Sequence, residues 1–185
     1  MPEIPARVEL RPLTAADQDE FCSLVRASAD LHAPWMQLPA TAQDFQKWMR
    51  RFEDGTVGTN LGFLVRVRQT GAAAGMININ SIIRGRYQGA SLGYAAFAPS
   101  AGQGYMTEGL VLALHYAFTT LRLHRLEADI QPGNKASLAM AQRLGFKYEG
   151  LSEDYLFIDG AWRDHERWSI TAPKPWTPDP SLPEV

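Results

Sequence analysis

The chain has 185 residues, a formal net charge of −2 at pH 7 and one cysteine, Cys22. This length favours one domain around one core, and the small net charge argues against a nucleic-acid or anionic membrane partner. One cysteine excludes an internal disulfide, no apolar run approaches the roughly 20 residues that span a bilayer, and the N-terminal residues lack a secretory signal, so we expect a cytoplasmic location.

The N-terminal third is predicted to contain a short strand and two helices. In chain order these are a strand over 8–12, a helix over 14–31 and a helix over 41–53. Each helix begins at a threonine with an aspartate three residues later, which is typical of a capping pair. A proline-broken linker over 32–40 joins them. Its Trp35 either packs on the edge of the core or walls a substrate groove, and we favour the groove.

The middle of the chain is predicted to form most of a sheet. A strand that begins at residue 60, a strand over 74–83 and a strand over 89–97 should form an antiparallel meander. A helix that ends near residue 121 leads to a strand over 125–130. This strand should lie parallel to the strand before the helix, through a right-handed crossover.

The C-terminal part is predicted to be a helix followed by a hairpin. The helix covers 135–144, and the strands cover 147–158 and 163–171 with a turn at Asp159 and Gly160. Prolines make the tail over 173–185 extended and disordered. The fold class is α/β (α+β), with a mixed sheet of about seven strands and four main helices in one domain over 1–172.

The stretch from Gly93 to Leu121 organises the rest, because it reads as strand, glycine loop and helix. The first turn of a helix offers unpaired N–H groups, and glycines at 102 and 104 keep side chains out of the way of an anion. The loop is therefore a candidate pyrophosphate cradle. It can equally be a tight loop whose glycines only turn the chain. Neither a P-loop nor a dinucleotide-binding fingerprint is present.

Three segments in this order carry a resemblance to a known family. They are GQGYMTEGL over 102–110, NKASLAMAQRLGFKYEG over 134–150 and YLFIDGAWRDH over 155–165. Together the first two resemble the GNAT superfamily of acyl-CoA N-acyltransferases, and the third resembles its RimJ/RimL-like branch. The resemblance covers the chain from Leu10 to about Thr171 and implies the GNAT fold. It also implies acetyl-CoA as co-substrate. We expect no metal, and a monomer or homodimer.

The resemblance implies a set of residues that bind the cofactor. The strand over 92–97 would diverge from its parallel neighbour, and an amide near Ala96 and Phe97 would polarise the thioester carbonyl. Asn134 would cap its helix, reach the cofactor, or do both, and Ser137 lies one turn on. The loop residues expected to hold the pyrophosphate are Gly102, Gln103, Gly104, Tyr105, Met106 and Thr107.

The sequence does not decide which residues carry protons during the reaction. Many members of the superfamily carry a tyrosine four residues past the serine, but this chain has Ala141 there, so Ser137 or water would protonate the leaving thiolate. Candidate bases are Glu127 and Asp129, which share a face of their strand with Gln131. Asp129 stands at the spacing of the catalytic glutamate in RimI-type enzymes.

Two further positions weaken that assignment. Ile130 and Leu156 occupy the places of the RimL-type cysteine and glutamate, and neither side chain can carry a proton. Glu108 is a third candidate base, although a glutamate in the first turn of a helix more often complements the helix dipole.

The acceptor side is indicated by aromatic and polar residues. Trp35, Tyr155, Trp162 and His165 are candidates for contact with the acceptor, while the last two can also belong to an ordinary edge strand. The histidines show no metal-ligand spacing.

Three functions remain open. The favoured one is acetyl transfer to the N-terminal α-amine of a protein or peptide. A small amine, such as an aminoglycoside, polyamine or amino-acid analogue, is the alternative acceptor. A non-catalytic acyl-CoA sensor is the third, since Ala141, Ile130 and Leu156 replace three familiar proton carriers.

Overall fold

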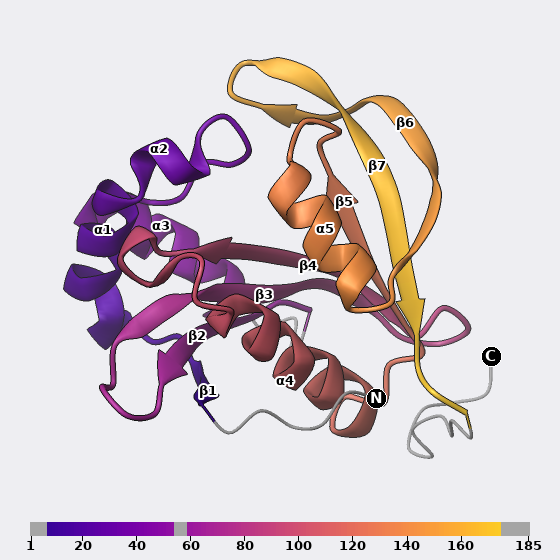
Figure 1. The fold of residues 1–185 in the computed structure, drawn as a ribbon, viewed down its shortest axis with the longest axis horizontal. Coiled ribbons are helices and arrows are strands. Elements are labelled where there is room, and N and C mark those ends of the chain that lie inside the picture. Colours follow the sequence, from indigo (N-terminus) through magenta and orange to yellow (C-terminus); the bar gives the residue numbers. More distant parts are fainter. Residues whose placement is uncertain (1–6, 54–58, 175–185) are drawn as a thin grey trace.

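A computed structural model describes residues 7–53 and 59–174, and Figure 1 shows the arrangement of their helices and strands. Residues 175–185, most of the tail predicted to be disordered, lie outside the described residues. The strands are β1 (Val8–Pro12), β2 (Leu61–Val67), β3 (Ala73–Ile83), β4 (Gly89–Ala96), β5 (Arg125–Ile130), β6 (Lys147–Ile158) and β7 (Ala161–Thr171). The helices are α1 (Gln18–Ala27), α2 (Ala29–His32), α3 (Ala42–Glu53), α4 (Tyr105–Thr119) and α5 (Lys135–Arg143), with short 3-10 turns at Ala15–Asp17 and Ala98–Ser100.

The seven strands form one mixed sheet in the order β1-β2-β3-β4-β5-β7-β6. Strands β2 to β4 are the predicted antiparallel meander, β1 adds to it antiparallel to β2, and β4 and β5 are the parallel pair that α4 connects. The C-terminal hairpin adds to the other side of β5 through β7, which leaves β6 at the edge (Figure 1). The predicted sheet is thus confirmed, including the parallel pair.

The parallel pair is very short. Strand β4 pairs with β5 only from Gly89 to Ser91, opposite Arg125 to Glu127. Beyond these residues β4 continues to pair with β3, and β5 continues to pair with β7. The sheet therefore opens between β4 and β5 in the half that follows the paired residues, as the resemblance implied.

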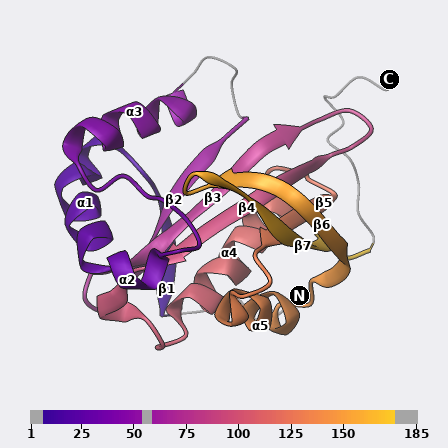
Figure 2. The same ribbon diagram turned by 90° about the horizontal axis from the view of Figure 1, so that it is seen from above.

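Apolar side chains are buried on both faces of the meander. On one face, Val65 and Ile77 pack in the cluster that contains the inner side of α4. On the other face, Leu64 and Met76 pack in a second cluster with α1 and α3. Figure 2 shows α1 to α3 grouped together, apart from α4 and α5. This packing holds α2 and α5 beside the open half of the sheet.

The first predicted helix is wrong in one respect, because it breaks at Ser28. A 3-10 turn and α1 replace its first part, and α2 is a separate turn that ends at His32. The Ser28 hydroxyl donates to the Leu24 carbonyl at 2.6 Å and accepts from the Ala98 N–H at 2.8 Å. This side-chain bonding competes with the helix ladder and ties α2 to the end of β4.

The predicted hairpin turn between β6 and β7 is confirmed. Asp159 and Gly160 both have positive φ, 52° and 73°, which is the geometry of a two-residue hairpin turn that follows the twist of the strands. The Asp159 carboxylate accepts a hydrogen bond from the side chain of Gln37 at 2.9 Å. The tip of the hairpin is thus joined to the linker between α2 and α3.

Candidate active site

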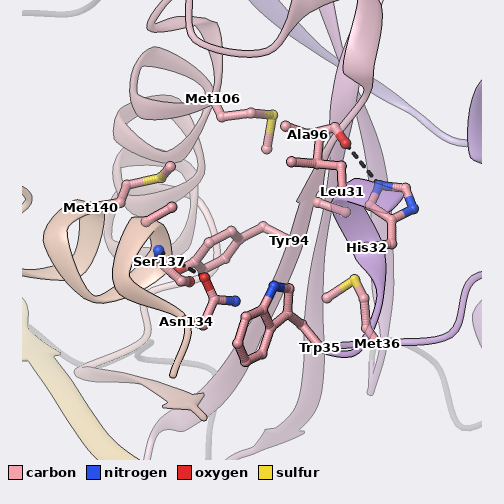
Figure 3. A pocket seen from close by; sticks show the side chains of 12 residues that line it. Leu31, His32, Trp35, Met36, Tyr94, Ala96, Met106, Asn134, Ser137 and Met140 are labelled. Carbon is pink, nitrogen blue, oxygen red and sulfur yellow. Dashed lines mark hydrogen bonds between the residues drawn. The ribbon is translucent and has the colours of Figure 1, made fainter. Parts of the chain in front are cut away.

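Two adjoining cavities occupy the open half of the sheet. The first cavity, about 150 Å³, lies between β4 and helices α2, α4 and α5 (Figure 3). The second cavity, about 80 Å³, lies between β4 and β5 and reaches β7. The residues that line both cavities are Trp35, Met36, Tyr94, Asn134 and Ser137. A molecule in one cavity can therefore meet a molecule in the other at these five side chains.

The backbone of β4 is exposed to this opening. The Phe97 N–H donates to the Ala74 carbonyl on the β3 side at 2.8 Å. Because backbone groups alternate between the two edges of a strand, the N–H and C=O of Ala96 face the opening. The Ala96 carbonyl accepts a hydrogen bond from Nε2 of His32 at 2.8 Å, which fixes the ring of this buried histidine (Figure 3).

The glycine loop places the N-terminus of α4 next to the first cavity, since Met106 lines it. Gly102 and Gly104 have φ of 75° and 82°, so this loop requires glycine for its left-handed backbone. The amides that follow have no partner one turn earlier and are suited to an anion. The Arg7 guanidinium lies beside the loop, where it pairs with Glu108 and donates to the Gln103 carbonyl at 3.2 Å.

Helix α5 brings two polar side chains to the junction of the cavities. The Asn134 side chain accepts the N–H of Ser137 at 3.1 Å, so Asn134 caps the helix and lines both cavities at once. The Ser137 hydroxyl lies 2.6 Å from the hydroxyl of Tyr94 on β4. Burial raises the pKa of Tyr94, and the hydrogen bond with Ser137 opposes that rise.

Asp129 is the carboxylate of the second cavity. Its side chain is 12% exposed, and burial raises its pKa, although the charge of Arg167 opposes the shift. Nε of Arg167 lies 2.6 Å from Oδ1 of Asp129. The N–H does not point along this line, so neither atom has a hydrogen-bond partner among the described residues.

Glu127 shares the face of β5 with Asp129 but has a different environment. Its carboxylate accepts hydrogen bonds from Tyr87 at 2.6 Å, Arg125 at 2.8 Å and Arg167 at 2.8 Å. Burial alone would raise its pKa, but these three bonds lower it overall. A carboxylate with three donors holds its charge and is a weak base.

The four candidate acceptor residues separate into two groups. Trp35 lines both cavities, and His165 is 2% exposed and lines the second. Tyr155 lines neither cavity but contacts the residues beside them: its ring lies 6.0 Å from the ring of His165 and 4.7 Å from the guanidinium of Arg167. Trp162 is 59% exposed at the hairpin tip, where it packs edge-to-face with Phe157 and lines neither cavity.

Among the described residues, no group of three His, Cys, Asp or Glu side chains could hold a metal ion. None of the helices in 7–53 and 59–174 combines the length and apolarity needed to cross a membrane.

Comparison with models of known protein families shows to which family the chain belongs. The model of the acetyltransferase (GNAT) domain matches residues 7–147. The chain belongs to the GNAT acetyltransferase family. Its mixed sheet with one short parallel pair is the GNAT fold.

Relatives within this family are named as N-acetyltransferases. The [ribosomal protein uS5]-alanine N-acetyltransferase of Escherichia coli K12 is 41% identical over 104 residues, which are 56% of this chain and 53% of that protein. The chain thus spans about half the length of this curated relative. The probable N-acetyltransferase YjcK of Bacillus subtilis is 29% identical over 171 residues, 90% of this chain and 94% of that protein.

A solved structure shows the same fold. RimJ from Mycobacterium smegmatis, in complex with CoA-disulfide, superposes with a TM-score of 0.82 and is 29% identical. The match covers 89% of this chain and 82% of that one.

Four of the ten residues expected to bind the cofactor line the first cavity. These are Ala96, Met106, Asn134 and Ser137. The remaining loop residues, Gly102, Gln103, Gly104, Tyr105 and Thr107, lie at or next to the N-terminus of α4.

The expectation for Phe97 needs correction. Its amide is already bonded to Ala74, and its fully buried ring packs with Phe21 in the second core cluster. Ala96 alone of the expected pair offers its amide to the opening. Glu108 lies in neither cavity and is paired with Arg7, so the structure separates it from Asp129.

Sequence reasoning missed three residues of the site: His32, Tyr94 and Arg167. A half-apolar strand gives no reason to single out Tyr94, whose partner is 43 residues away. Residue 32 looked like part of a linker. The alternation of β7 could have found Arg167, since it stands two residues after His165 on the same face of the strand.

Proposed function

We propose that the chain is an acetyl-CoA-dependent N-acetyltransferase that brings acetyl-CoA and an amine together in one complex. The observation that carries this proposal is the meeting of two cavities at Tyr94, Asn134 and Ser137, in the place where β4 and β5 separate. One cavity borders the glycine loop and the other contains a carboxylate. This is the arrangement that direct transfer of an acyl group from a thioester to an amine requires.

The residues of the first cavity fit acetyl-CoA. The left-handed loop at Gly102 and Gly104 directs the free amides of α4 to where a diphosphate would bind. The pantetheine arm would lie along β4, where the edge that faces β5 has no strand partner after Ser91. The Ala96 N–H would donate to the thioester oxygen as negative charge develops on it, a contribution of about 3 kcal/mol for one such donor.

Asp129 is proposed as the base on the amine side. It lines the second cavity, and burial raises its pKa even though the adjacent Arg167 opposes the shift. A base must take one proton from the ammonium before nitrogen can attack. An α-amine has a reference pKa of about 8 against about 10.4 for lysine, so an N-terminal amine gives up this proton more readily.

We propose the N-terminal α-amine of a protein or peptide as the acceptor. The second cavity, about 80 Å³, has room for an amine and a small first side chain. The relative named for alanine of ribosomal protein uS5 supports such an acceptor. Trp35 and His165 would border the first residue of the acceptor.

Release of CoA from acetyl-CoA tests this function. The acceptors are peptides that begin with Ala, Ser or Met, the same Ala peptide with a blocked N-terminus, and spermidine. We expect turnover with the Ala and Ser peptides and none with the blocked peptide. Faster turnover with spermidine would assign a small amine instead, and binding of acetyl-CoA without turnover of any acceptor would indicate a sensor.

A further inference from the structure

The hydroxyls of Tyr94 and Ser137 meet at the junction of the two cavities. Tyr94 extends from β4 toward α5, and its hydroxyl meets that of Ser137 (Figure 3). We propose that Tyr94 and Ser137 form a proton relay, in which Tyr94 is a catalytic residue that carries a proton from the acceptor nitrogen through Ser137 to the leaving sulfur. This inference rests on the function proposed above.

The location of the pair is the first argument. Both side chains line both cavities. The thioester carbon must lie where the cavities meet, because the acyl group enters from one cavity and the amine from the other. A hydroxyl at that junction can reach either the nitrogen or the sulfur.

The second argument is the rigidity of Ser137. Its backbone N–H is held by the Asn134 side chain at 3.1 Å, in the first turn of α5. Its hydroxyl, at 2.6 Å from Tyr94, can donate in either direction. Such a short contact between two groups that both donate and accept allows a proton to enter at one end and leave at the other.

The third argument is that, among the described residues that line the two cavities, only Tyr94 and Ser137 carry a hydroxyl. Ala141, one turn further along α5, is 2% exposed and carries no proton. Ile130, which lines the second cavity, and Leu156, which is 39% exposed on β6, cannot carry one either. Tyr94 supplies from a strand the phenol that α5 lacks.

The chemistry balances without an external acid. Attack forms the N–C bond and leaves a positively charged nitrogen that still holds the proton to be lost. As the C–S bond breaks, this proton passes to the Tyr94 oxygen, the Tyr94 proton passes to Ser137, and the Ser137 proton passes to sulfur. The nitrogen becomes a neutral amide, the sulfur becomes the thiol of CoA, and both hydroxyls are restored.

A relay also agrees with the acidity of the groups. A thiol has a reference pKa of about 8.5 and tyrosine about 10. Burial raises the pKa of Tyr94 further. Tyr94 acting alone would therefore be a poor acid, because loss of its proton would leave a buried phenolate, but a relay that replaces the proton at once never leaves it in that state.

The test is the single-turnover rate of acetyl transfer to an Ala-initial peptide, measured with purified full-length chain. The variants are Tyr94→Phe, Ser137→Ala and the double variant, with Tyr116→Phe as the matched control. Tyr116 is a half-buried tyrosine of α4 that packs on Phe63, outside both cavities. CoA affinity is measured by calorimetry for each variant.

We expect Tyr94→Phe and Ser137→Ala each to slow transfer by about 10- to 1,000-fold, the range that proton transfer contributes. The double variant should be no slower than the slower single variant, because groups that act as a unit are not additive. The solvent deuterium isotope effect on the rate should decrease, and CoA affinity should stay within about twofold. The control should behave as wild type.

The outcomes separate the relay from the proposed function. Wild-type turnover together with unchanged rates and isotope effects in Tyr94→Phe would overturn the relay alone. Losses that multiply in the double variant, or a loss of CoA affinity that accounts for the slower rate, would also overturn it. Absence of turnover by the wild-type chain with the peptides and spermidine would overturn both.

Discussion

Arg167 holds Asp129 by charge without a hydrogen bond. Nε of Arg167 lies 2.6 Å from Oδ1 of Asp129, yet the N–H is not directed at that oxygen. The same guanidinium donates properly to Glu127 at 2.8 Å. The strand thus carries two carboxylates of different character, one saturated with donors and one in a cavity with its basicity preserved.

Replacement of Asp129 by Asn should remove the base and leave the cofactor site intact. We expect kcat/KM for an Ala-initial peptide at pH 7 to fall by about 100-fold, a common contribution of a general base. Calorimetry should give a CoA affinity within about twofold of wild type, since Asp129 lies in the second cavity only.

Asp154→Asn is the matched control for this change. Asp154 is exposed on β6 with φ of 46°, a conformation that Asn tolerates. If Asp129→Asn kept wild-type kcat/KM at pH 7, Asp129 would not be the base.

The pH dependence of kcat/KM should report the raised pKa of Asp129. The base acts as a carboxylate, so activity should fall as pH drops through a pKa above the ordinary value of about 3.9. Arg167→Gln removes the nearby positive charge and should raise this pKa further, which moves the acid limb to higher pH. A limb that stays in place, or moves to lower pH, would contradict the assignment.

Glu127 should contribute to stability. Its folded-state pKa is lowered, so its stabilising effect is present above the unfolded-state pKa and is lost as pH falls through the folded-state pKa. We expect Glu127→Gln to lower the free energy of unfolding by about 1–3 kcal/mol at pH 7, because it weakens bonds to partly buried arginines.

Urea denaturation at a series of pH values measures this effect. The difference between wild type and Glu127→Gln should begin to shrink as pH falls below the unfolded-state pKa of about 4.3, and should be lost once pH is below the lowered folded-state pKa of Glu127. A constant difference across pH would show that charge is not the cause.

Gly104→Ala should weaken CoA binding through the backbone of the glycine loop. Its φ of 82° costs a residue with a side chain about 1–2 kcal/mol, and relief of this strain would turn the amides of α4 away from the diphosphate. Calorimetry with CoA should show about 10-fold weaker binding or more, on the scale of that cost.

Gly145→Ala provides the control, because Gly145 has a φ of 86° at the end of α5 with no atom within 4 Å of an added Cβ. We expect the control to lose a similar amount of stability with normal CoA affinity. Equal loss of affinity in both variants would mean that the loop holds no phosphate.

His32→Leu should disturb the wall of the first cavity. Nε2 of His32 bonds the Ala96 carbonyl at 2.8 Å, and loss of this donor leaves a strand carbonyl without its partner. We expect kcat/KM for acetyl-CoA to fall by about 10-fold, since an unpaired buried group costs about 1–3 kcal/mol and the adjacent amide would shift. Steady-state kinetics with varied acetyl-CoA check this, and unchanged values would mean that His32 only fills space.

Much of the fold could be predicted because its signals are local. The capping pairs, the period-two runs, the glycine loop and the Asp159–Gly160 turn each lie within a few residues, and each element appears near its predicted bounds. The prediction failed at Ser28, where the apolar pattern continues through the break. A bond to Ala98, 70 residues away, decides that position.

The glycine loop was more predictable than the identity of the base. Backbone amides can bind a diphosphate whatever the side chains are, so the glycines and the helix start predict an anion site, although the same glycines can simply turn the chain. The sequence left Glu127 and Asp129 as the main candidates for the base, because both point to the same face of β5. Only their partners separate them, because Glu127 is saturated by three donors while Asp129 faces a cavity.

The sequence alone determined the order of the helices and strands, the parallel crossover and the glycine loop. These features depend on neighbouring residues and on general rules of chain connection. Tertiary structure decided that Tyr94 meets Ser137, that His32 holds Ala96, and that Phe97 belongs to the core. These contacts join residues more than forty positions apart or depend on which edge of a strand is already paired. No local pattern encodes them, because they exist only once the helices have packed on the sheet.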